Sequence, residues 1–413
     1  MATMLEAQRA WIRAALQRHV ERTGQQLEVA DPVPFESQGF EFYCPLFRVV
    51  ARGSSATTLL VVKILPPEGL DLYLTARLQY RNESLFYGDF LRFLLDTAVG
   101  GREGLDQIKA IGSLFPKLFC AYEDDSQCLL ALEDLTPSGF VHAPKILDLA
   151  HMKLSLRELG RLHALSYIAK KRNPKKFFNV VKRFNRWEEE MCGKYSILIH
   201  GMVQFCAELF RAKFPEDSEK YAHRLARLDA EADKFFKLTE PEEPLAVLCH
   251  ADYNRNNIMF TYDAEGKPSS LKAIDFQLAM YSSPAIDLSL LLFLSTSPEV
   301  RDPHWDELLD TYRSSVLDAM ELSLCCERDV LEQEYSREVL ARDFGKFCLH
   351  GFLVTAFFLP VTMMTPQESE QLTRESPSET TAERVEAKKR LCSDEVKHRL
   401  AVLLKVMLER NFL

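Results

Sequence analysis

The secondary-structure signals of this 413-residue chain change character at about Thr136, and this change constrains the fold more than any other feature. Before it, the runs FEFYCPLFRVVAR (40–52) and TTLLVVKILP (57–66) are rich in β-branched and aromatic residues, and RGSSATT between them favours a turn. These runs therefore predict a β-hairpin. A helical pattern over 71–98 follows, and then a second strand pair that ends with QCLLALEDL at 127–135.

After Thr136, long helical patterns dominate, beginning with 147–171. Within them lies one island of two short β-like runs, NIMFTY and LKAIDFQ, joined by the turn-rich stretch DAEGKPSS (246–277 overall). The length allows two lobes that share a cleft. We therefore expect an α+β protein with a strand-rich N-terminal lobe over 1–135 and a mostly helical C-terminal lobe over 136–413.

Composition narrows the class of protein. A hydrophobic content of 47% supports a sizeable core, and the net charge of −9 with scattered basic residues argues against a surface for nucleic acid or an anionic membrane. Ten cysteines without metal-ligand spacing favour a reducing compartment, so we expect a cytoplasmic protein. No protein partner is predicted. An anion the size of ATP would need a local positive site.

Three segments could indicate a signal peptide, a membrane span or a mobile loop. The N-terminal stretch carries charges throughout with apolar residues at helical spacing, which predicts an amphipathic helix and not a signal peptide. The apolar run 347–364 is interrupted by His350, Gly351 and Pro360, so we expect a buried helix and no membrane span. The polar segment 365–390 predicts a solvated, mobile loop.

Two charged residues interrupt apolar surroundings in the first part of the chain. Lys63 lies inside LLVVKIL, and Glu83 shares a predicted helix face with Phe86, Tyr87 and Phe90. A buried charge is costly unless it is paired, so pairing of Lys63 with Glu83 is the economical arrangement, and it leaves the ammonium aimed at an anion. The alternative is that Lys63 extends out of an edge strand and Glu83 lies at the helix rim.

Three polar residues in the island form a second set. Asp252 precedes Asn257 by five positions, and Asp275 follows at the end of the next apolar run. Two carboxylates and an amide oxygen suit Mg²⁺ that also binds phosphate oxygens. In phosphoryl transfer, a loop aspartate accepts the hydroxyl proton, an asparagine five positions on binds metal, and a later aspartate bridges metal to phosphate. The spacing therefore predicts a phosphotransferase.

The same region carries a family resemblance. HADYNRNNIMF, AIDFQ and SSPAIDLSLLLF, together with RNESLFYGDFL, LLALEDL and LGRLHALSYI, resemble the ecdysteroid kinase-like (CHK kinase-like) branch of the aminoglycoside phosphotransferase and choline kinase-like group. The resemblance spans roughly 35–300 and implies a bilobal protein-kinase-like fold with ATP between the lobes.

The resemblance also implies roles for individual residues. Asp252 would be the catalytic base, and Asn257 and Asp275 the Mg²⁺ ligands. Lys63 would contact the α- and β-phosphates while held by Glu83. The remaining roles are hydrogen bonds to adenine from the backbone around Glu133 and Leu135, and a brace for the catalytic loop from Asp287.

Several neighbouring residues complete the expected site. We expect His250 to hold the loop by hydrogen-bonding backbone, and His163 to be a core residue with a satisfied hydrogen bond. Two positions depart from the family pattern: Ala251 stands where glycine is usual, and Asn254 where an aromatic or basic residue is usual. Alanine is comfortable there only if its backbone φ is negative. The phosphate-covering loop is placed at 36–45, which holds the single glycine Gly39.

The spacing after Asp275 indicates the class of acceptor. SPAID begins only eight positions later, which leaves no room for a peptide-docking segment, so a small alcohol is the expected acceptor. The family branch implies a steroid-like or other lipophilic alcohol, and ATP and Mg²⁺ as cofactors. The alternatives are a catalytically weak protein that binds nucleotide or lipophile, and a choline- or aminoglycoside-type kinase with a polar acceptor.

Overall fold

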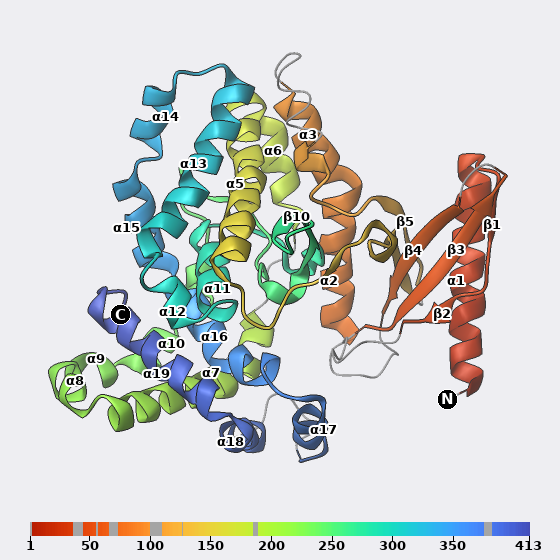
Figure 1. The fold of residues 1–413 in the computed structure, drawn as a ribbon. Helices are drawn as coiled ribbons and strands as arrows, with labels where there is room; N and C mark the ends of the chain where they lie inside the picture. Colours follow the sequence, from red (N-terminus) through yellow and green to blue (C-terminus); the bar gives the residue numbers. More distant parts are fainter. Residues whose placement is uncertain are drawn as a thin grey trace.

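The computed structural model describes residues 2–35, 44–54, 57–65, 73–99, 110–125, 127–184, 189–375 and 382–413. Within these ranges the chain forms a lobe built on an antiparallel sheet and a larger lobe built mostly from helices (Figure 1). The predicted α+β, bilobal kinase-like fold is thus confirmed.

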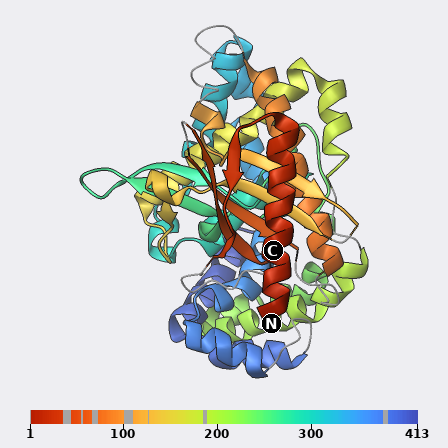
Figure 2. The ribbon, with the colours of Figure 1, turned by 90° about the vertical axis from the view of Figure 1, so that its right-hand side faces the viewer.

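The sheet of the first lobe has the strand order β1-β3-β4-β6-β5, with β2 paired to β3. Helix α1 (Ala2–Thr23) lies across one face of this sheet (Figure 2), where Ile12 and Leu16 are buried in a small core that α1 shares with the strands. The predicted hairpin is the pair β3 and β4. The strands are β1 (Leu27–Val29), β2 (Val33–Pro34), β3 (Leu46–Gly53), β4 (Thr57–Ile64), β5 (Leu118–Glu123) and β6 (Cys128–Glu133).

The second face of the sheet meets a long helical segment. It comprises α2 (Tyr73–Leu85), a π-helical turn (Phe86–Phe90) and α3 (Leu91–Ala98). The hydroxyl of Tyr80 donates to the carbonyls of Tyr122 (3.0 Å) and Leu129 (3.1 Å), which ties the helix to the sheet. The ring of Phe86 stacks on that of Phe276 in the second lobe, with centroids 3.7 Å apart. The segment therefore connects the two lobes.

The helical lobe is organised around α5 (Leu149–Arg172), which packs against α13 (Trp305–Leu324). The two helices approach so closely at Gly160 that an added Cβ would lie 2.7 Å from the carbonyl oxygen of Tyr312. The other helices are α6 (Pro174–Val181), α7 (Glu189–Lys213), α8 (Pro215–Lys220), α9 (Ala222–Leu225), α10 (Leu228–Ala232), α11 (Ala285–Leu294), α12 (Pro298–Arg301), α14 (Arg328–Glu334), α15 (Arg337–Phe347), α16 (Leu349–Thr362), α17 (Pro366–Glu375), α18 (Ala382–Leu391) and α19 (Asp394–Glu409).

The predicted β island forms two small sheets inside this lobe. Strand β9 (Ile258–Tyr262) pairs with β10 (Pro268–Ala273) and with β7 (Val141–His142), while β8 (Val247–Cys249) pairs with β11 (Met280–Ser282). The amide of Ile274 donates to the carbonyl of Asn257 (3.0 Å). The hairpin therefore brings Asn257 next to Asp275, although the two are far apart in the sequence.

The prediction of a loop over 365–390 was wrong for the described part of that segment, which forms α17 and α18. Each helix carries a few apolar anchors, such as Leu372 and Val385, which are 1% and 4% exposed. The low average hydrophobicity of the segment concealed these anchors, because two or three buried positions are enough to hold a short helix against a larger core.

The apolar run 347–364 contains α16, which is mostly buried as predicted. Among the described residues, no single helix has both the length and the apolar composition to cross a membrane; the bent pair Arg328–Phe347 and Leu349–Thr362 meets those two criteria only when taken together.

Candidate active site

A cavity of about 770 Å³ lies between the two lobes. Strands β3, β4 and β6 and helix α2 line it from the sheet lobe, and the loops around β8, β9 and β10 line it from the helical lobe together with α7 and α16. Every predicted site residue lines this cavity: Lys63, Glu83, Glu133, Leu135, Asp252, Asn257 and Asp275.

On the side of the cavity formed by the sheet lobe, the ammonium of Lys63 forms ion pairs with two carboxylates. Lys63 lies on β4 with Leu46 opposite it on β3 and Leu130 opposite it on β6, so it is on an interior strand and the edge-strand alternative is wrong. Its Nζ contacts Oε2 of Glu83 at 3.0 Å, which confirms the predicted pair.

The same Nζ contacts two further oxygens, Oδ1 of Asp275 and Oε1 of Gln277, each at 2.9 Å. Burial disfavours the ammonium of Lys63, but the charges of Asp275 and Glu83 outweigh it and hold the lysine pKa above its ordinary value. Gln277 was not predicted as a site residue. Its only signal in the sequence is that it follows Asp275 by two positions.

Asp252 is held by two asparagines. Nδ2 of Asn257 donates to its Oδ2 and Nδ2 of Asn254 donates to its Oδ1, both at 2.7 Å. Burial and the nearby charge of Asp275 raise the pKa of Asp252 to about 7, while the two amides partly offset that rise. A carboxylate with a pKa near neutrality is suited to accept a proton during catalysis.

Two oxygens remain available as metal ligands. Nδ2 of Asn257 is occupied by Asp252, and among the described residues no hydrogen bond reaches Oδ1 of Asn257 or Oδ2 of Asp275. Asp275 adopts a left-handed backbone, with φ +68°, as it leads away from β10. An amide oxygen and a carboxylate oxygen at the cavity wall are hard donors of the kind that Mg²⁺ takes together with phosphate oxygens. The residues present therefore fit the metal.

Asp287 holds the backbone of the catalytic loop. It is fully buried in the first turn of α11, where Oδ2 accepts from the amide of His250 and Oδ1 from the amide of Ala251, both at 2.7 Å. Nε2 of His163 lies 3.1 Å from Oδ2 of Asp287, and Nδ1 of His163 lies 2.8 Å from the hydroxyl of Tyr312. The predicted bracing role of Asp287 and the satisfied core role of His163 are confirmed.

His250 bridges the catalytic loop to the end of the β9–β10 hairpin. Its Nε2 donates to the carbonyl of Ile274 at 2.9 Å, and its Nδ1 accepts from the amide of Asp252 at 3.3 Å. Burial lowers the pKa of His250, which favours this neutral form. The histidine thus hydrogen-bonds backbone, as predicted.

Ala251 has a φ of +63°, in the left-handed region that glycine adopts without strain. Alanine is therefore strained at this position, where the family resemblance led us to expect glycine. Asn254 contacts Asp252 itself and also accepts from the amide of Asn256 at 3.0 Å, which begins a short 3₁₀ turn. Neither contact of Asn254 was predicted, because both depend on the direction in which the loop turns.

The expected adenine contacts lie at the end of β6. The amide of Glu133 donates to the carbonyl of Lys117 at 2.9 Å, whereas the amide of Leu135 has no hydrogen-bond partner among the described residues. Leu135 is therefore the better donor for a base at this edge. Most of the proposed phosphate-covering loop, 36–43, lies outside the described residues; Cys44 lines the cavity.

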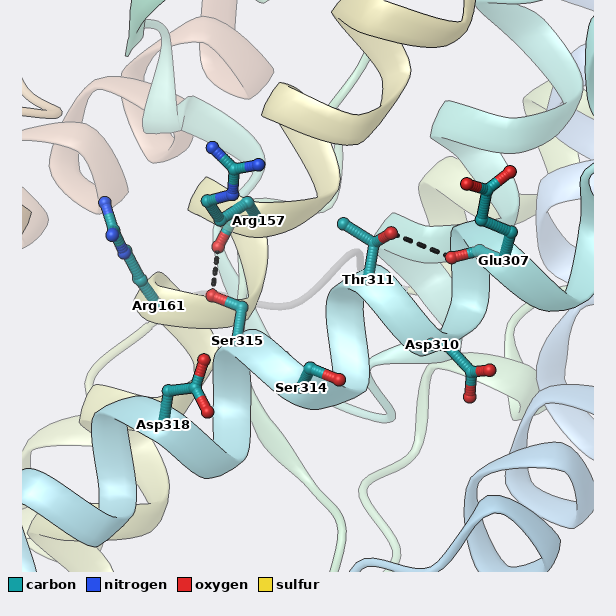
Figure 3. A pocket seen from close by; sticks show the side chains of 8 residues that line it. All are labelled: Arg157, Arg161, Glu307, Asp310, Thr311, Ser314, Ser315 and Asp318. Atoms are coloured by element: carbon teal, nitrogen blue, oxygen red, sulfur yellow. Dashed lines mark hydrogen bonds between the residues drawn. The ribbon is translucent and has the colours of Figure 1, made fainter.

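A second cavity, of about 590 Å³, lies between α5 and α13 (Figure 3). Its lining is polar, and two of its hydroxyls are engaged with backbone: Ser315 donates to the carbonyl of Arg157 at 2.6 Å and Thr311 to that of Glu307 at 2.8 Å. None of the predicted site residues lines it. The predicted site residues therefore belong to the cavity between the lobes and not to this one.

A strand lysine paired with a helix carboxylate, facing an Asp-Asn-Asp set across a cleft, is the arrangement of a kinase-like phosphotransferase. Residues 39–324 match the model of the ecdysteroid kinase-like family, and the chain belongs to this family. The predicted resemblance is thus confirmed. The protein is a small-molecule phosphotransferase with an alcohol group as acceptor.

Solved structures give more distant likenesses. A spectinomycin phosphotransferase in complex with ADP and spectinomycin is 12% identical, with a TM-score of 0.41 over 94% of this chain and 95% of that one. An ethanolamine kinase from Plasmodium vivax is 15% identical, with a TM-score of 0.37 over 84% of this chain and 82% of that one. No curated protein matches the sequence.

Proposed function

We propose that this protein transfers the γ-phosphate of ATP to a hydroxyl of a small lipophilic alcohol. The observation that carries the proposal is the continuity of one cavity, which has Lys63 and Asp252 on its polar side and an apolar surface on its helical side. A polar nucleotide and an apolar acceptor would both find a complementary surface in it.

The residues on the polar side have distinct tasks in this reaction. Lys63, held by Glu83, Asp275 and Gln277, would neutralise phosphate charge. Asp252 would orient the acceptor hydroxyl and take its proton. Asn257 and Asp275 would hold Mg²⁺, which when bound neutralises charge on the phosphates.

The apolar side of the cavity supports a lipophilic acceptor. We name this side the helical wall, and it is built from α7, from the segment before Thr239 and from one face of α16. The residues of the helical wall are Leu198, Ile199, Phe235, Phe236, His350, Val354, Phe357, Phe358 and Val361. Because these residues are apolar except for one histidine, the helical wall favours a lipophilic molecule over a polyamine or an aminoglycoside, which would lose hydration against it. Tyr195, Thr239 and Lys388 also line the cavity and are the other polar side chains on this side among the described residues.

One observation favours a second candidate, a protein that binds nucleotide and lipophile with little turnover. Ala251 keeps the catalytic loop in a left-handed conformation that costs a non-glycine residue about 1–2 kcal/mol. If this strained loop relaxed to another conformation, it would move Asp252 away from the acceptor hydroxyl and lower the rate of phosphate transfer. Against this candidate, the base, the metal ligands and the lysine pair all line the same cavity.

Transfer of labelled phosphate from ATP to a panel of lipophilic and polar alcohols tests the proposal. We expect transfer to lipophilic members, loss of transfer in Asp252→Ala with nucleotide affinity retained, and weaker Mg-ATP binding in Asp275→Ala. Nucleotide binding without transfer to any alcohol would instead support the second candidate. Full activity of Asp252→Ala would contradict the assignment of the base.

A further inference from the structure

His350 is the one polar residue on the face of α16 that lines the cavity. That face consists of His350, Val354, Phe357 and Val361, at offsets of four, seven and eleven positions. The side chain of His350 is 5% exposed, and its ring stacks on Phe235 with centroids 4.8 Å apart and an interplanar angle of 7°. The imidazole is therefore part of the helical wall.

The ring nitrogens of His350 have no hydrogen-bond partner in the part of the chain that the structure describes. Nδ1 is buried without a hydrogen bond, and no hydrogen bond joins either nitrogen to another described residue. A buried polar atom left unpaired costs about 1–3 kcal/mol. Histidines elsewhere in this lobe, such as His163 and His250, have both nitrogens engaged. The missing partner of His350 therefore needs an explanation.

The position of His350 is set by tight packing behind it. The next residue, Gly351, faces α11 so closely that an added Cβ would lie 2.3 Å from Oγ of Ser289. Helix α16 therefore cannot shift toward α11 to bring the imidazole to another partner. Burial lowers the pKa of His350 to about 4, so at neutral pH the ring has one N–H donor and one acceptor nitrogen.

We propose that His350 is a specificity-determining residue, whose imidazole forms a hydrogen bond with a hydroxyl of the lipophilic molecule bound against the helical wall. A hydroxyl can both donate and accept a hydrogen bond, so it can pair with either ring nitrogen of the neutral imidazole. The inference rests on the proposed function of the cavity as an acceptor site, and it adds that the lipophile is selected for an oxygen at this position.

Binding of two isosteric probes, 2-naphthol and 2-methylnaphthalene, tests the inference without relying on turnover. The protein is saturated with a non-hydrolysable ATP analogue and Mg²⁺, and each probe is titrated by its fluorescence. We expect the wild-type chain to bind 2-naphthol about tenfold more tightly, since a hydroxyl that pairs a buried polar group contributes on the order of 1 kcal/mol or more.

Substitutions test whether His350 causes the preference for 2-naphthol over 2-methylnaphthalene. His350→Phe preserves the ring stacking on Phe235 and should reduce the preference below twofold, while His350→Gln should restore part of it. Phe357→Leu, in the same wall, should weaken both probes equally. Asp252→Asn should keep the preference, which separates His350 from the base. Without ligand, His350→Phe should melt no lower than wild type; if it fails to fold, His350→Leu replaces it.

The outcomes separate this inference from the kinase proposal. A preference that persists in the folded His350 variant overturns the inference, as does a wild-type protein that fails to bind or to discriminate the probes. The kinase proposal is decided by phosphate transfer, which these titrations do not measure. Discrimination by His350 in a protein without transfer would support the inference and contradict only the activity.

Discussion

Nδ2 of Asn254 donates a 2.7 Å hydrogen bond to Oδ1 of Asp252, the carboxylate that we assign as the base. The family resemblance led us to expect an aromatic or basic residue at the position of Asn254. The amide cannot neutralise a phosphoryl group as a cation would, but it holds Oδ1 of the carboxylate while Asn257 holds Oδ2. The departure therefore changes how the base is oriented.

Asn254→Ala should lower kcat about tenfold with an accepted alcohol, because a hydrogen bond to a charged group contributes about 1.5–3 kcal/mol and orients Asp252. Affinity for a nucleotide analogue should change less than twofold, since Asn254 does not contact the lysine cluster. Steady-state kinetics and a nucleotide titration measure the two effects. Asn256→Ala, in the same loop, is the matched control, because no hydrogen bond from a described residue reaches its Oδ1. A fully active Asn254→Ala would show that Asn257 alone suffices.

Asp287→Asn should destabilise the fold by about 2–4 kcal/mol, measured as the free energy of unfolding in urea. Asp287 accepts from two backbone amides and faces His163, and an asparagine would turn a donor toward one of these groups. Asp229→Asn, at an exposed position on α10, should change the free energy by less than about 0.5 kcal/mol. Equal effects of the two changes would contradict the bracing role.

Ala251→Gly should raise the free energy of unfolding by about 0.5–1 kcal/mol. Glycine relieves the left-handed strain at φ +63°, and the gain exceeds the entropy that glycine adds to the unfolded chain. Ala279→Gly is the control, because Ala279 is also buried but has φ −49°; this variant should lose about 0.5–1 kcal/mol of unfolding free energy. The prediction is contradicted if both glycines destabilise to the same extent.

Gln277→Leu should weaken Mg-ATP binding about three- to tenfold, because Lys63 loses one of its three oxygen partners and is less well fixed toward phosphate. Isothermal titration with a non-hydrolysable analogue measures this change. Gln204→Leu, on the surface of α7, makes the same substitution away from the cavity and should leave affinity unchanged. Unaltered affinity in Gln277→Leu would mean that Glu83 and Asp275 position the lysine by themselves.

The local patterns of the sequence were enough to predict a fold of two lobes and a set of residues that line the cavity between them. Runs rich in β-branched and aromatic residues located β3 and β4, and two short apolar runs joined by a turn located β9 and β10. The spacing of polar residues in the island singled out Asp252, Asn257 and Asp275. These features could be predicted because they depend on neighbours a few positions apart. The charge of Lys63 inside an apolar strand likewise predicted its partner Glu83, since a buried ammonium needs a carboxylate.

Only the tertiary structure decided which atoms meet once distant segments pack. It placed Gln277 on Lys63, turned Asn254 onto Asp252, set the φ of Ala251, and folded two helices from a segment whose composition suggested a loop. It also left His350, on the wall of the cavity, without a hydrogen-bond partner among the described residues. Each of these depends on contacts between elements far apart in the chain, whereas a sequence pattern reports the preferences of a residue and its near neighbours.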